Sequence, residues 1–330
     1  MAVYTQLGAE ALAALIGEFD VGALVSAKGI AEGVSNSNWL IDTCGREGFG
    51  ARFILTMFEG RTEVAELPFF LGLLDHLSAK GCPVPRTIHD RTGATHRMVA
   101  TDNGPRAVAL IEFLPGVSVS QPTPAQARAV GAALAGLHLA ATDFPMRRAN
   151  TMALAAWTQL LGDCGAAGVA AIDAGLGETV AAELAFLAAH WPQGLPTGII
   201  HADLFPDNVL MLGDAVKGLI DFYFACHDIL AYDVAVTHAA WCFSADGRQF
   251  DAGISQALLA GYEAVRPLGD GERAALPVLA RGAAMRFLAT RAYDWINTPA
   301  DALVTPKDPL AFARRLAFYA DPANQQVFAA

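Results

Sequence analysis

Residues 200–210 of this chain read IHADLFPDNVL, and residues 219–222 read LIDF. The two segments carry three oxygen-bearing side chains, Asp203, Asn208 and Asp221, at intervals of five and thirteen positions. A short apolar run precedes each segment, which is typical of a strand that ends in a loop. The pattern therefore predicts two strand-edge loops that face each other and bring the three side chains together.

These three side chains match the requirements of phosphoryl transfer from ATP. That chemistry uses one carboxylate to accept the proton of the attacking hydroxyl, and an amide and a carboxylate to hold Mg²⁺ against the phosphates. We predict that Asp203 is the catalytic base and that Asn208 and Asp221 bind Mg²⁺. We expect the Asp221 carboxylate at the tip of a buried strand, where an unpaired charge is costly and a metal partner is favoured. The alternative is that all three serve as local turn or strand-end caps.

The neighbours of these residues suggest supporting roles. We interpret His201 as a buried histidine that bonds backbone carbonyls and braces the catalytic loop, and Asp207 as solvent-facing. Asp233 precedes the apolar helical stretch at residues 234–236. A role as the N-cap of that helix is expected, and bracing of the catalytic loop is the alternative.

Composition limits the class of protein. The chain has 330 residues, of which 54% are hydrophobic and 17% charged, so it is long enough for two lobes with large cores. The net charge of −11 and the absence of a basic run argue against nucleic-acid binding. We predict no membrane-spanning segment. The residues up to Phe19 predict an amphipathic helix and not a signal peptide, and the five scattered cysteines favour a reducing cytoplasm.

The fold class expected is α+β, with a small antiparallel sheet followed by a mainly helical part. One helix, at about residues 62–80, interrupts the strands, and Gly81 ends it. Five strands are predicted, at Ala23–Ile30, Ser37–Cys44, Arg52–Glu59, His96–Thr101 and Arg106–Leu114. Helices are predicted from a capped start at Thr123-Pro124 onward, and then at 151–161, 176–190, 251–266, 271–297 and 308–320.

The boundary between the two lobes is expected at residues 112–116, which read EFLPG. We therefore divide the chain into an N-terminal lobe, residues 1–114, and a C-terminal lobe, residues 115–330. A short linker of this kind offers backbone groups to adenine, so Glu112 and Leu114 are candidate nucleotide contacts. The connection at 29–38 is rich in glycine and small polar residues that let backbone N–H groups approach phosphates. Its candidate residues are Gly29, Gly33, Ser35 and Asn36.

The predicted helix at 271–297 carries charged residues on an otherwise apolar pattern. The first interpretation is surface charge, with Arg291 and Asp294 as a pair one turn apart. The second is that one of Arg281, Arg286 and Arg291 faces the active site and binds a carboxylate with two hydrogen bonds. His138 is expected to be a packed residue near the end of its helix and not a ligand.

The His-x-Asp-x-x-x-x-Asn segment followed by Ile-Asp-Phe resembles the active site of the aminoglycoside-phosphotransferase and choline-kinase-like superfamily, a branch of the protein-kinase fold. Other stretches are similar to bacterial homoserine kinases of this superfamily, over essentially the whole chain. They are 28–33, 53–56, 67–71, 221–226 and 292–295. The resemblance implies a bilobal kinase-like fold, ATP and Mg²⁺ as cofactors, L-homoserine as the small-molecule substrate, and O-phosphohomoserine as the product on the way to threonine.

The chain departs from the family pattern at two positions. Kinases of this fold place a cation on the third strand to hold the α- and β-phosphates, paired with a Glu of the following helix, Glu63 or Glu66 here. Thr56 occupies the cation's position and supplies no charge. Lys28 and Arg52 are the candidates to compensate, and the alternative is that the metal carries more of the phosphate charge. Tyr223 replaces the glycine of the usual Asp-Phe-Gly, which suggests a loop less able to flip.

Three alternatives remain open. The acceptor could be another small alcohol, such as an aminoglycoside, choline or methylthioribose. The chain could bind ATP without catalysis, as the missing strand cation suggests. A metal-dependent hydrolase could use His201, Asp203, His227 and Asp228 as ligands.

Overall fold

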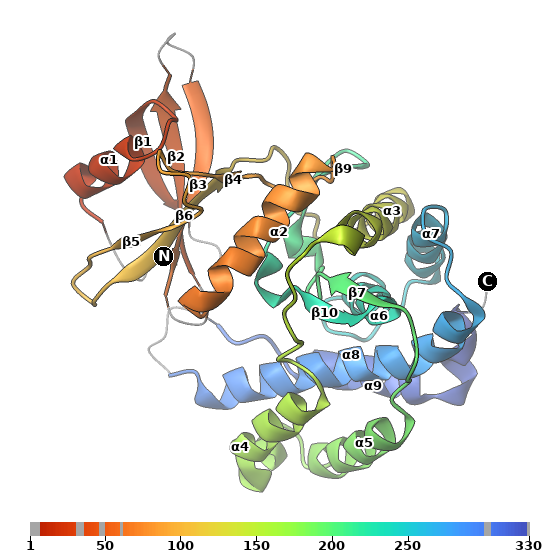
Figure 1. Ribbon diagram of the computed structural model, residues 1–330. Coiled ribbons are helices and arrows are strands. Elements are labelled where there is room, and N and C mark those ends of the chain that lie inside the picture. Colours follow the sequence, from red (N-terminus) through yellow and green to blue (C-terminus); the bar gives the residue numbers. More distant parts are fainter. Residues whose placement is uncertain (1–6, 31–35, 46–49, 60–61, 300–304, 329–330) are drawn as a thin grey trace. The chain divides into compact units, whose positions relative to one another are not determined.

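The computed structural model describes residues 7–30, 36–45, 50–59, 62–299 and 305–328. The chain folds into two compact units, Met1–Pro115 and Gly116–Ala330. The first unit carries the sheet and the second most of the helices, so the predicted α+β class is confirmed (Figure 1).

The first unit is built on an antiparallel sheet in the order β1-β2-β3-β6-β4, with β5 paired to β6. All five predicted strands are present, β1 with the predicted ends and the other four with shifted ends. A sixth, β4, was not predicted because it has only two residues and pairs with a strand some twenty positions later. The strands are β1 (Ala23–Ile30), β2 (Asn36–Cys44), β3 (Gly50–Phe58), β4 (Thr87–Ile88), β5 (Arg97–Val99) and β6 (Arg106–Glu112).

The two faces of this sheet have different surroundings. Trp39 lies opposite Leu55 in the register, so their side chains share one face. That face packs against Leu12 and Ile16 of α1 (Ala9–Gly17), the described part of the predicted N-terminal helix. Thr56 points to the other face. The alternation thus assigns each strand residue to a side.

The predicted helix at 62–80 begins later than expected. A 3-10 turn at Val64–Glu66 leads into α2 (Leu67–Ala79), which has proline in its first turn. The residue Gly81 has a φ of +79°, a left-handed conformation that stops the helix. Thr87 of β4 donates its hydroxyl to the Leu71 carbonyl at 2.9 Å and thereby holds α2 to the sheet.

The second unit is mainly helical. Thr123 and Gln126 form the predicted capping box at its first helix. The helix predicted at 151–161 is longer than expected, because it continues beyond a non-helical Gly165. The helices are α3 (Pro124–Ala140), α4 (Leu154–Ile172), α5 (Leu176–His190), α6 (Leu230–Trp241), α7 (Ala252–Glu263), α8 (Asp270–Asn297) and α9 (Leu310–Ala320).

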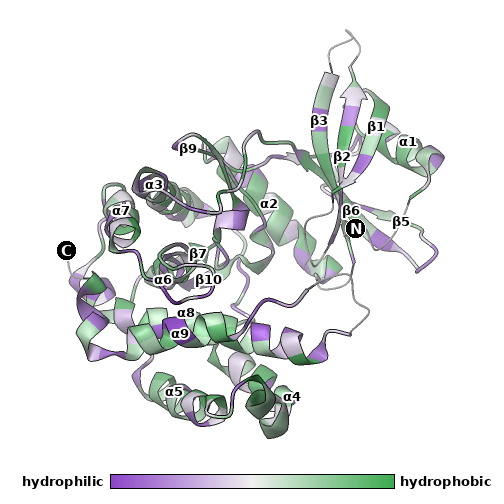
Figure 2. Cartoon of the chain, turned by 180° about the vertical axis from the view of Figure 1, so that it is seen from behind, coloured by the Kyte–Doolittle hydropathy of each residue, from purple (hydrophilic) through white to green (hydrophobic). Residues whose placement is uncertain are grey.

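Helix α6 lies at the centre of this unit, and all twelve of its residues are buried. A helix buried on every side belongs to the core. It packs against α8, and α8 also contacts α9 (Figure 1). Helix α9 is mostly hydrophobic apart from Arg314 and Arg315 at its middle, and Figure 2 shows both kinds of residue along it; its buried residues include Phe312 and Leu316.

Two short antiparallel strand pairs complete the second unit. Strand β7 (Thr197–Ile200) pairs with β10 (Cys226–Ile229), and β8 (Val209–Leu212) pairs with β9 (Ala215–Leu219). The β8–β9 hairpin turns at Gly213, which has a φ of +58°. These pairs place the loops at 201–208 and 220–225 next to each other, since the outer ends of both loops are fixed by β7 and β10.

Candidate active site

The loop between β7 and β8 brings Asp203 and Asn208 together. The Nδ2 group of Asn208 donates to the Asp203 carbonyl at 2.8 Å and to Asp203 Oδ2 at 3.2 Å. This orients the amide, because the nitrogen end is used by Asp203 and the Oδ1 end is left for another partner. The loop also closes on itself, since Phe205 N–H donates to the Asp203 carbonyl at 2.8 Å.

Asp221 stands two residues after β9 and is connected to the same loop. The N–H of Ile220 donates to the Asn208 carbonyl at 3.0 Å. The backbone of Asp221 has a φ of 65° and a ψ of 60°, a left-handed conformation that is unusual outside glycine. The expectation that this carboxylate is buried was wrong: Asp221 is exposed to solvent, because the left-handed turn directs it away from the strand.

The two carboxylates influence each other. The pKa of Asp203 is raised to about 7, because desolvation and the charge of Asp221 together outweigh the lowering effect of Arg286. Desolvation also raises the pKa of Asp221. Because Asp221 is exposed to solvent, water screens part of this effect. Two nearby acids that each resist ionisation form a site that a cation would stabilise.

His201 is the buried bracing residue predicted. Its Nδ1 accepts from the Asp203 N–H at 3.2 Å, so its Nε2 carries the proton and donates to the Ile220 carbonyl at 3.0 Å. The side chain is 0% exposed, and burial lowers its pKa. Its ring also packs on Phe222 at 4.5 Å between centroids. A neutral His201 therefore links the Asp203 loop to the Asp221 loop.

The prediction that Asp233 caps a helix was wrong, and its alternative is confirmed. Helix α6 starts three residues earlier, so Asp233 lies inside its first turn, fully buried. Its carboxylate accepts from the N–H groups of His201 at 2.6 Å and Ala202 at 2.7 Å. Desolvation alone would raise the pKa of Asp233, but its hydrogen bond with His138 and the nearby charges lower it overall. It thus braces the loop as an anion.

Arg286 holds the same loop from the opposite side. The expectation of surface charge was wrong for this residue, which is 2% exposed, and its Nη1 donates to the Ala202 carbonyl. Ala202 has a φ of 65°, which costs an alanine roughly 1–2 kcal/mol. Asp233 accepts from the N–H of Ala202, and Arg286 donates to its carbonyl. Both backbone polar groups of this strained residue, directly before Asp203, are therefore held.

A buried polar chain behind Asp233 was not predicted. His138, expected to be a packed residue, donates its Nε2–H to Asp233 Oδ2 at 3.0 Å, and its Nδ1 is hydrogen-bonded to Tyr262 Oη at 2.8 Å. Tyr262 in turn accepts from Arg266 at 3.1 Å, and Arg266 pairs with Glu272 at 2.9 Å. These residues span more than 130 positions, so no local pattern could have joined them. The weak sequence signal was a histidine on an otherwise apolar helix face.

The nucleotide-contact candidates of the first unit are described in part. Gly29 is exposed near the end of β1, and Asn36 is buried at the start of β2. Glu112 ends β6, where its N–H donates to the Arg86 carbonyl at 2.9 Å and its carboxylate accepts from Arg86 N–H at 3.2 Å. Leu114 is half-buried. The remaining candidates, Gly33 and Ser35, lie outside the described residues.

The position expected for a phosphate-binding cation is occupied by a buried hydroxyl. Thr56 is 3% exposed and donates to Asn38 Oδ1 at 2.8 Å. Arg52 pairs with Asp42 at 2.9 Å. Lys28 lies opposite Leu40 of β2, which in turn lies opposite Ile54 of β3, two residues before Thr56. The side chain of Lys28 therefore lies on the same face of the sheet as that of Thr56. Lys28 is exposed and forms no ion pair with any described residue.

The hydrolase alternative finds no support in the described residues. Among them, no three His, Cys, Asp or Glu side chains are grouped as metal ligands. The Nε2 of His201 is used by a carbonyl, and Asp228 accepts from Asn150 at 2.6 Å.

Within the described residues, no helix combines the length and the hydropathy that crossing a bilayer demands.

Comparison with known proteins shows what kind of enzyme this geometry belongs to. Residues 26–268 match the model of the phosphotransferase enzyme family. A homoserine kinase of Xanthobacter autotrophicus is 51% identical over 320 residues, which cover 97% of this chain and 96% of the relative. A homoserine kinase of Phenylobacterium zucineum is 50% identical over 333 residues, which cover 100% and 99%.

Solved structures agree on the fold. An amicoumacin kinase has a TM-score of 0.70 at 14% identity, over 98% of this chain and 93% of that one. A microcompartment-associated aminopropanol kinase has a TM-score of 0.69 at 20% identity, over 94% and 96%. The expected kinase-like fold is confirmed. The chain belongs to the phosphotransferase enzyme family and is a phosphotransferase that acts on an alcohol group of a small molecule.

Proposed function

We propose that this enzyme transfers the γ-phosphoryl group of ATP to the side-chain hydroxyl of L-homoserine. The observation that carries the proposal is the Asp203–Asn208–Asp221 arrangement in a chain that is about half identical, over its whole length, to homoserine kinases. The arrangement supports the reaction type, and the identity supports the acceptor. We place the reaction in the cytoplasm, in keeping with five free cysteines.

Asp203 receives the proton in this proposal. The homoserine oxygen forms a bond to the γ-phosphorus while the bond from that phosphorus to the β–γ bridging oxygen breaks, and ADP leaves. The hydroxyl proton passes to the Asp203 carboxylate. A base with a pKa near 7 suits this transfer, because about half of it is ionised at neutral pH and the ionised form is basic enough to take the proton. A fixed Ala202 keeps the carboxylate directed at the acceptor.

The donor set fits Mg²⁺. Hard oxygen ligands are what Mg²⁺ requires, and it keeps waters and phosphates as its other ligands. Asn208 is held through its nitrogen, which leaves Oδ1 for the metal, and Asp221 presents an exposed carboxylate. We propose that Asn208 and Asp221 hold the ion. When bound, it would neutralise charge on the phosphates and relieve the repulsion between Asp203 and Asp221.

The first unit is proposed to hold the nucleotide. Backbone groups of Gly29, Gly33, Ser35 and Asn36 would contact the phosphates, and Glu112 and Leu114 the adenine. Because Thr56 supplies no charge and Arg52 is paired with Asp42, we assign the phosphate-holding cation to Lys28.

An acceptor screen tests the proposal. ADP release would be measured with Mg²⁺-ATP and each of homoserine, serine, threonine, choline, methylthioribose and an aminoglycoside, and the product identified by ³¹P NMR. We expect turnover only with Mg²⁺ and a kcat/KM for homoserine far above the others. Equal turnover with another alcohol would refute the homoserine assignment, and ATP binding without any phosphorylated product would refute catalysis.

A further inference from the structure

Helix α8 carries four arginines, of which Arg273 pairs with Glu263. The other three are the candidates for binding a carboxylate near Asp203, and two of these are committed elsewhere. Arg281 pairs with Glu183 through two hydrogen bonds, at 2.5 and 2.6 Å, and lies 3.4 Å from the centre of the Phe186 ring. Arg286 is buried and bonded to the catalytic loop. Neither can take a carboxylate without giving up a structural partner, which leaves Arg291.

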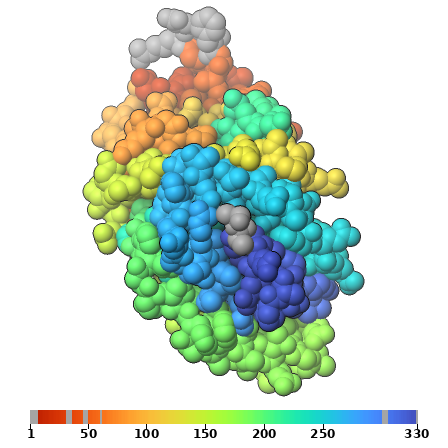
Figure 3. Space-filling model, turned by 90° about the vertical axis from the view of Figure 1, so that its right-hand side faces the viewer, coloured from red at the N-terminus to blue at the C-terminus, as the bar shows by residue number. Residues whose placement is uncertain are grey.

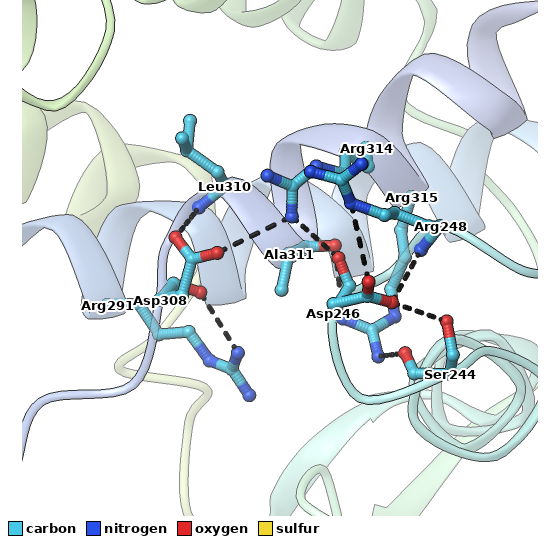
Figure 4. A network of polar contacts seen from close by, with 9 residues as sticks. All are labelled: Ser244, Asp246, Arg248, Arg291, Asp308, Leu310, Ala311, Arg314 and Arg315. Atoms are coloured by element: carbon cyan, nitrogen blue, oxygen red, sulfur yellow. Dashed lines mark hydrogen bonds and ion pairs between the residues drawn. The ribbon is translucent and has the colours of Figure 1, made fainter.

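Arg291 is held in place but not neutralised. One Nη group donates to the backbone carbonyl of Asp308 at 3.2 Å, and the guanidinium stacks 4.5 Å from the centre of the Phe312 ring. Asp308 directs its carboxylate to Arg314 and to the Leu310 N–H, away from Arg291 (Figure 4). Within the described residues no carboxylate forms an ion pair with Arg291, which is half-buried and has further N–H donors.

The surroundings of Arg291 favour an added anion. Desolvation lowers the pKa of Arg291 to about 10, so the guanidinium remains charged at neutral pH. Arg315, buried 4.4 Å from the centre of the same Phe312 ring, repels it. The nearby carboxylates of Asp308, Asp203 and Asp207 act on Arg291 in the opposite sense. Two of them have cationic partners of their own, since Asp207 pairs with Lys307 at 3.3 Å and Asp308 with Arg314 at 3.4 Å. An unpaired, partly desolvated cation next to a second cation gains free energy when a carboxylate binds it with two hydrogen bonds.

We propose that Arg291 binds the α-carboxylate of the amino-acid substrate while the substrate's hydroxyl lies at Asp203. Phe312 connects the two groups: its ring lies 6.1 Å from that of Phe205, two residues after Asp203, and Arg291 stacks on the same Phe312 ring. The hydroxyl oxygen and the carboxylate carbon of homoserine are four bonds apart, roughly 5 Å with bonds of about 1.5 Å.

Arg291 comes from α8 and its supports come from α9 and the residues before it. Figure 3 shows the blue residues of α8 and the dark blue C-terminal residues side by side on one face of the second unit. Phe312 fixes the plane of the guanidinium, and the Asp308 carbonyl fixes one edge. The opposite edge is thereby pre-oriented for a planar, two-oxygen ligand, which lowers the entropy lost on binding.

The test compares substrates with and without the carboxylate. Steady-state kinetics would be measured for the full-length wild type, Arg291→Gln and Arg291→Lys, with homoserine and with 3-aminopropan-1-ol, which lacks only the carboxylate. For homoserine, Arg291→Gln should raise KM by about 10²-fold, the usual effect of removing one partner of a buried charged pair. The kcat and the KM for ATP should change little, and Arg291→Lys should recover part of the loss.

Controls separate this outcome from general damage. Arg314→Gln, which removes the other arginine at Asp308, should leave the KM for homoserine unchanged. For 3-aminopropan-1-ol, wild type and Arg291→Gln should have similar kcat/KM. Equal losses for both alcohols, or a normal KM for homoserine in Arg291→Gln, would overturn the assignment. The inference rests on the proposed function, whose own failure is distinct: wild type would then not phosphorylate homoserine at all.

Discussion

Replacing Asp233 by Asn should loosen the catalytic loop without touching any reacting atom. The carboxylate accepts three N–H groups: His201 N and His138 Nε2 on one oxygen, at 2.6 and 3.0 Å, and Ala202 N on the other, at 2.7 Å. An amide has one oxygen. If that oxygen keeps its hydrogen bonds with His201 N–H and His138 Nε2–H, the new NH₂ group faces the Ala202 N–H. Both of these groups are donors, so no hydrogen bond forms between them.

The size of the effect follows from these contacts. Losing one hydrogen bond to a charged acceptor costs about 1.5–3 kcal/mol, and leaving a buried donor without a partner costs about 1–3 kcal/mol. Since both apply to one buried group, we expect the free energy of unfolding to fall by roughly 3–5 kcal/mol. Ala202, with its φ of 65°, would lose its support, and a loop displacement near 1 Å can reduce kcat by about 10²-fold.

Urea unfolding and steady-state kinetics on the same preparations provide the measurement. The matched control is Thr237→Val, one turn further along α6, which removes a buried hydroxyl that bonds only the Asp233 carbonyl at 2.9 Å. It should cost about 1 kcal/mol and leave kcat unchanged. The reasoning is refuted if Asp233→Asn behaves like Thr237→Val in both measurements.

Three further outcomes are expected. Asp221→Ala should raise the Mg²⁺ concentration needed for half-maximal activity sharply, and an unchanged Mg²⁺ titration would exclude it as a ligand. Gly131→Ala should destabilise the fold by about 1–3 kcal/mol, because the new Cβ would meet the Leu258 carbonyl of α7; unaltered urea unfolding would contradict this close helix contact. Hydrogen bonds from the Thr92 hydroxyl and the nearby backbone hold the pKa of Asp90 well below its usual range. Its stabilising effect is therefore complete above the unfolded pKa of about 3.9 and is lost as pH falls further, so the stability difference between wild type and Asp90→Asn should shrink below about pH 4. A difference that is constant down to pH 2 would disprove that linkage.

Features with a local physical cause were predictable from the sequence. The start of α3 followed from a hydroxyl, a proline and a glutamine at fixed spacing, and all their hydrogen bonds are present. The role of His201 as a buried, hydrogen-bonded histidine and that of His138 as a packed one followed from their apolar neighbours. Strand β4 was missed because a two-residue strand has no periodicity of its own and exists only through its pairing with β6.

Features that depend on distant residues were not predictable. Asp233 before an apolar run reads equally well as a helix cap or a buried brace, and only its distances to residues 31 and 32 positions away decide between them. Arg286 and Arg281 look alike in the sequence, yet one is bonded to the catalytic loop and the other to Glu183. Asp221 was expected inside because apolar residues precede it, but its left-handed backbone turns it to solvent.

The most direct test of the central claim, that Asp203 is the base of a homoserine-phosphorylating site, is the single-turnover rate of Asp203→Asn. Phosphohomoserine would be quantified by ³¹P NMR, and the Kd for Mg²⁺-ATP measured in parallel. We predict an unchanged Kd, because the amide keeps the shape of the carboxylate, and a rate about 10²–10⁴-fold below wild type. A near-normal rate, with homoserine still the acceptor, would contradict the account.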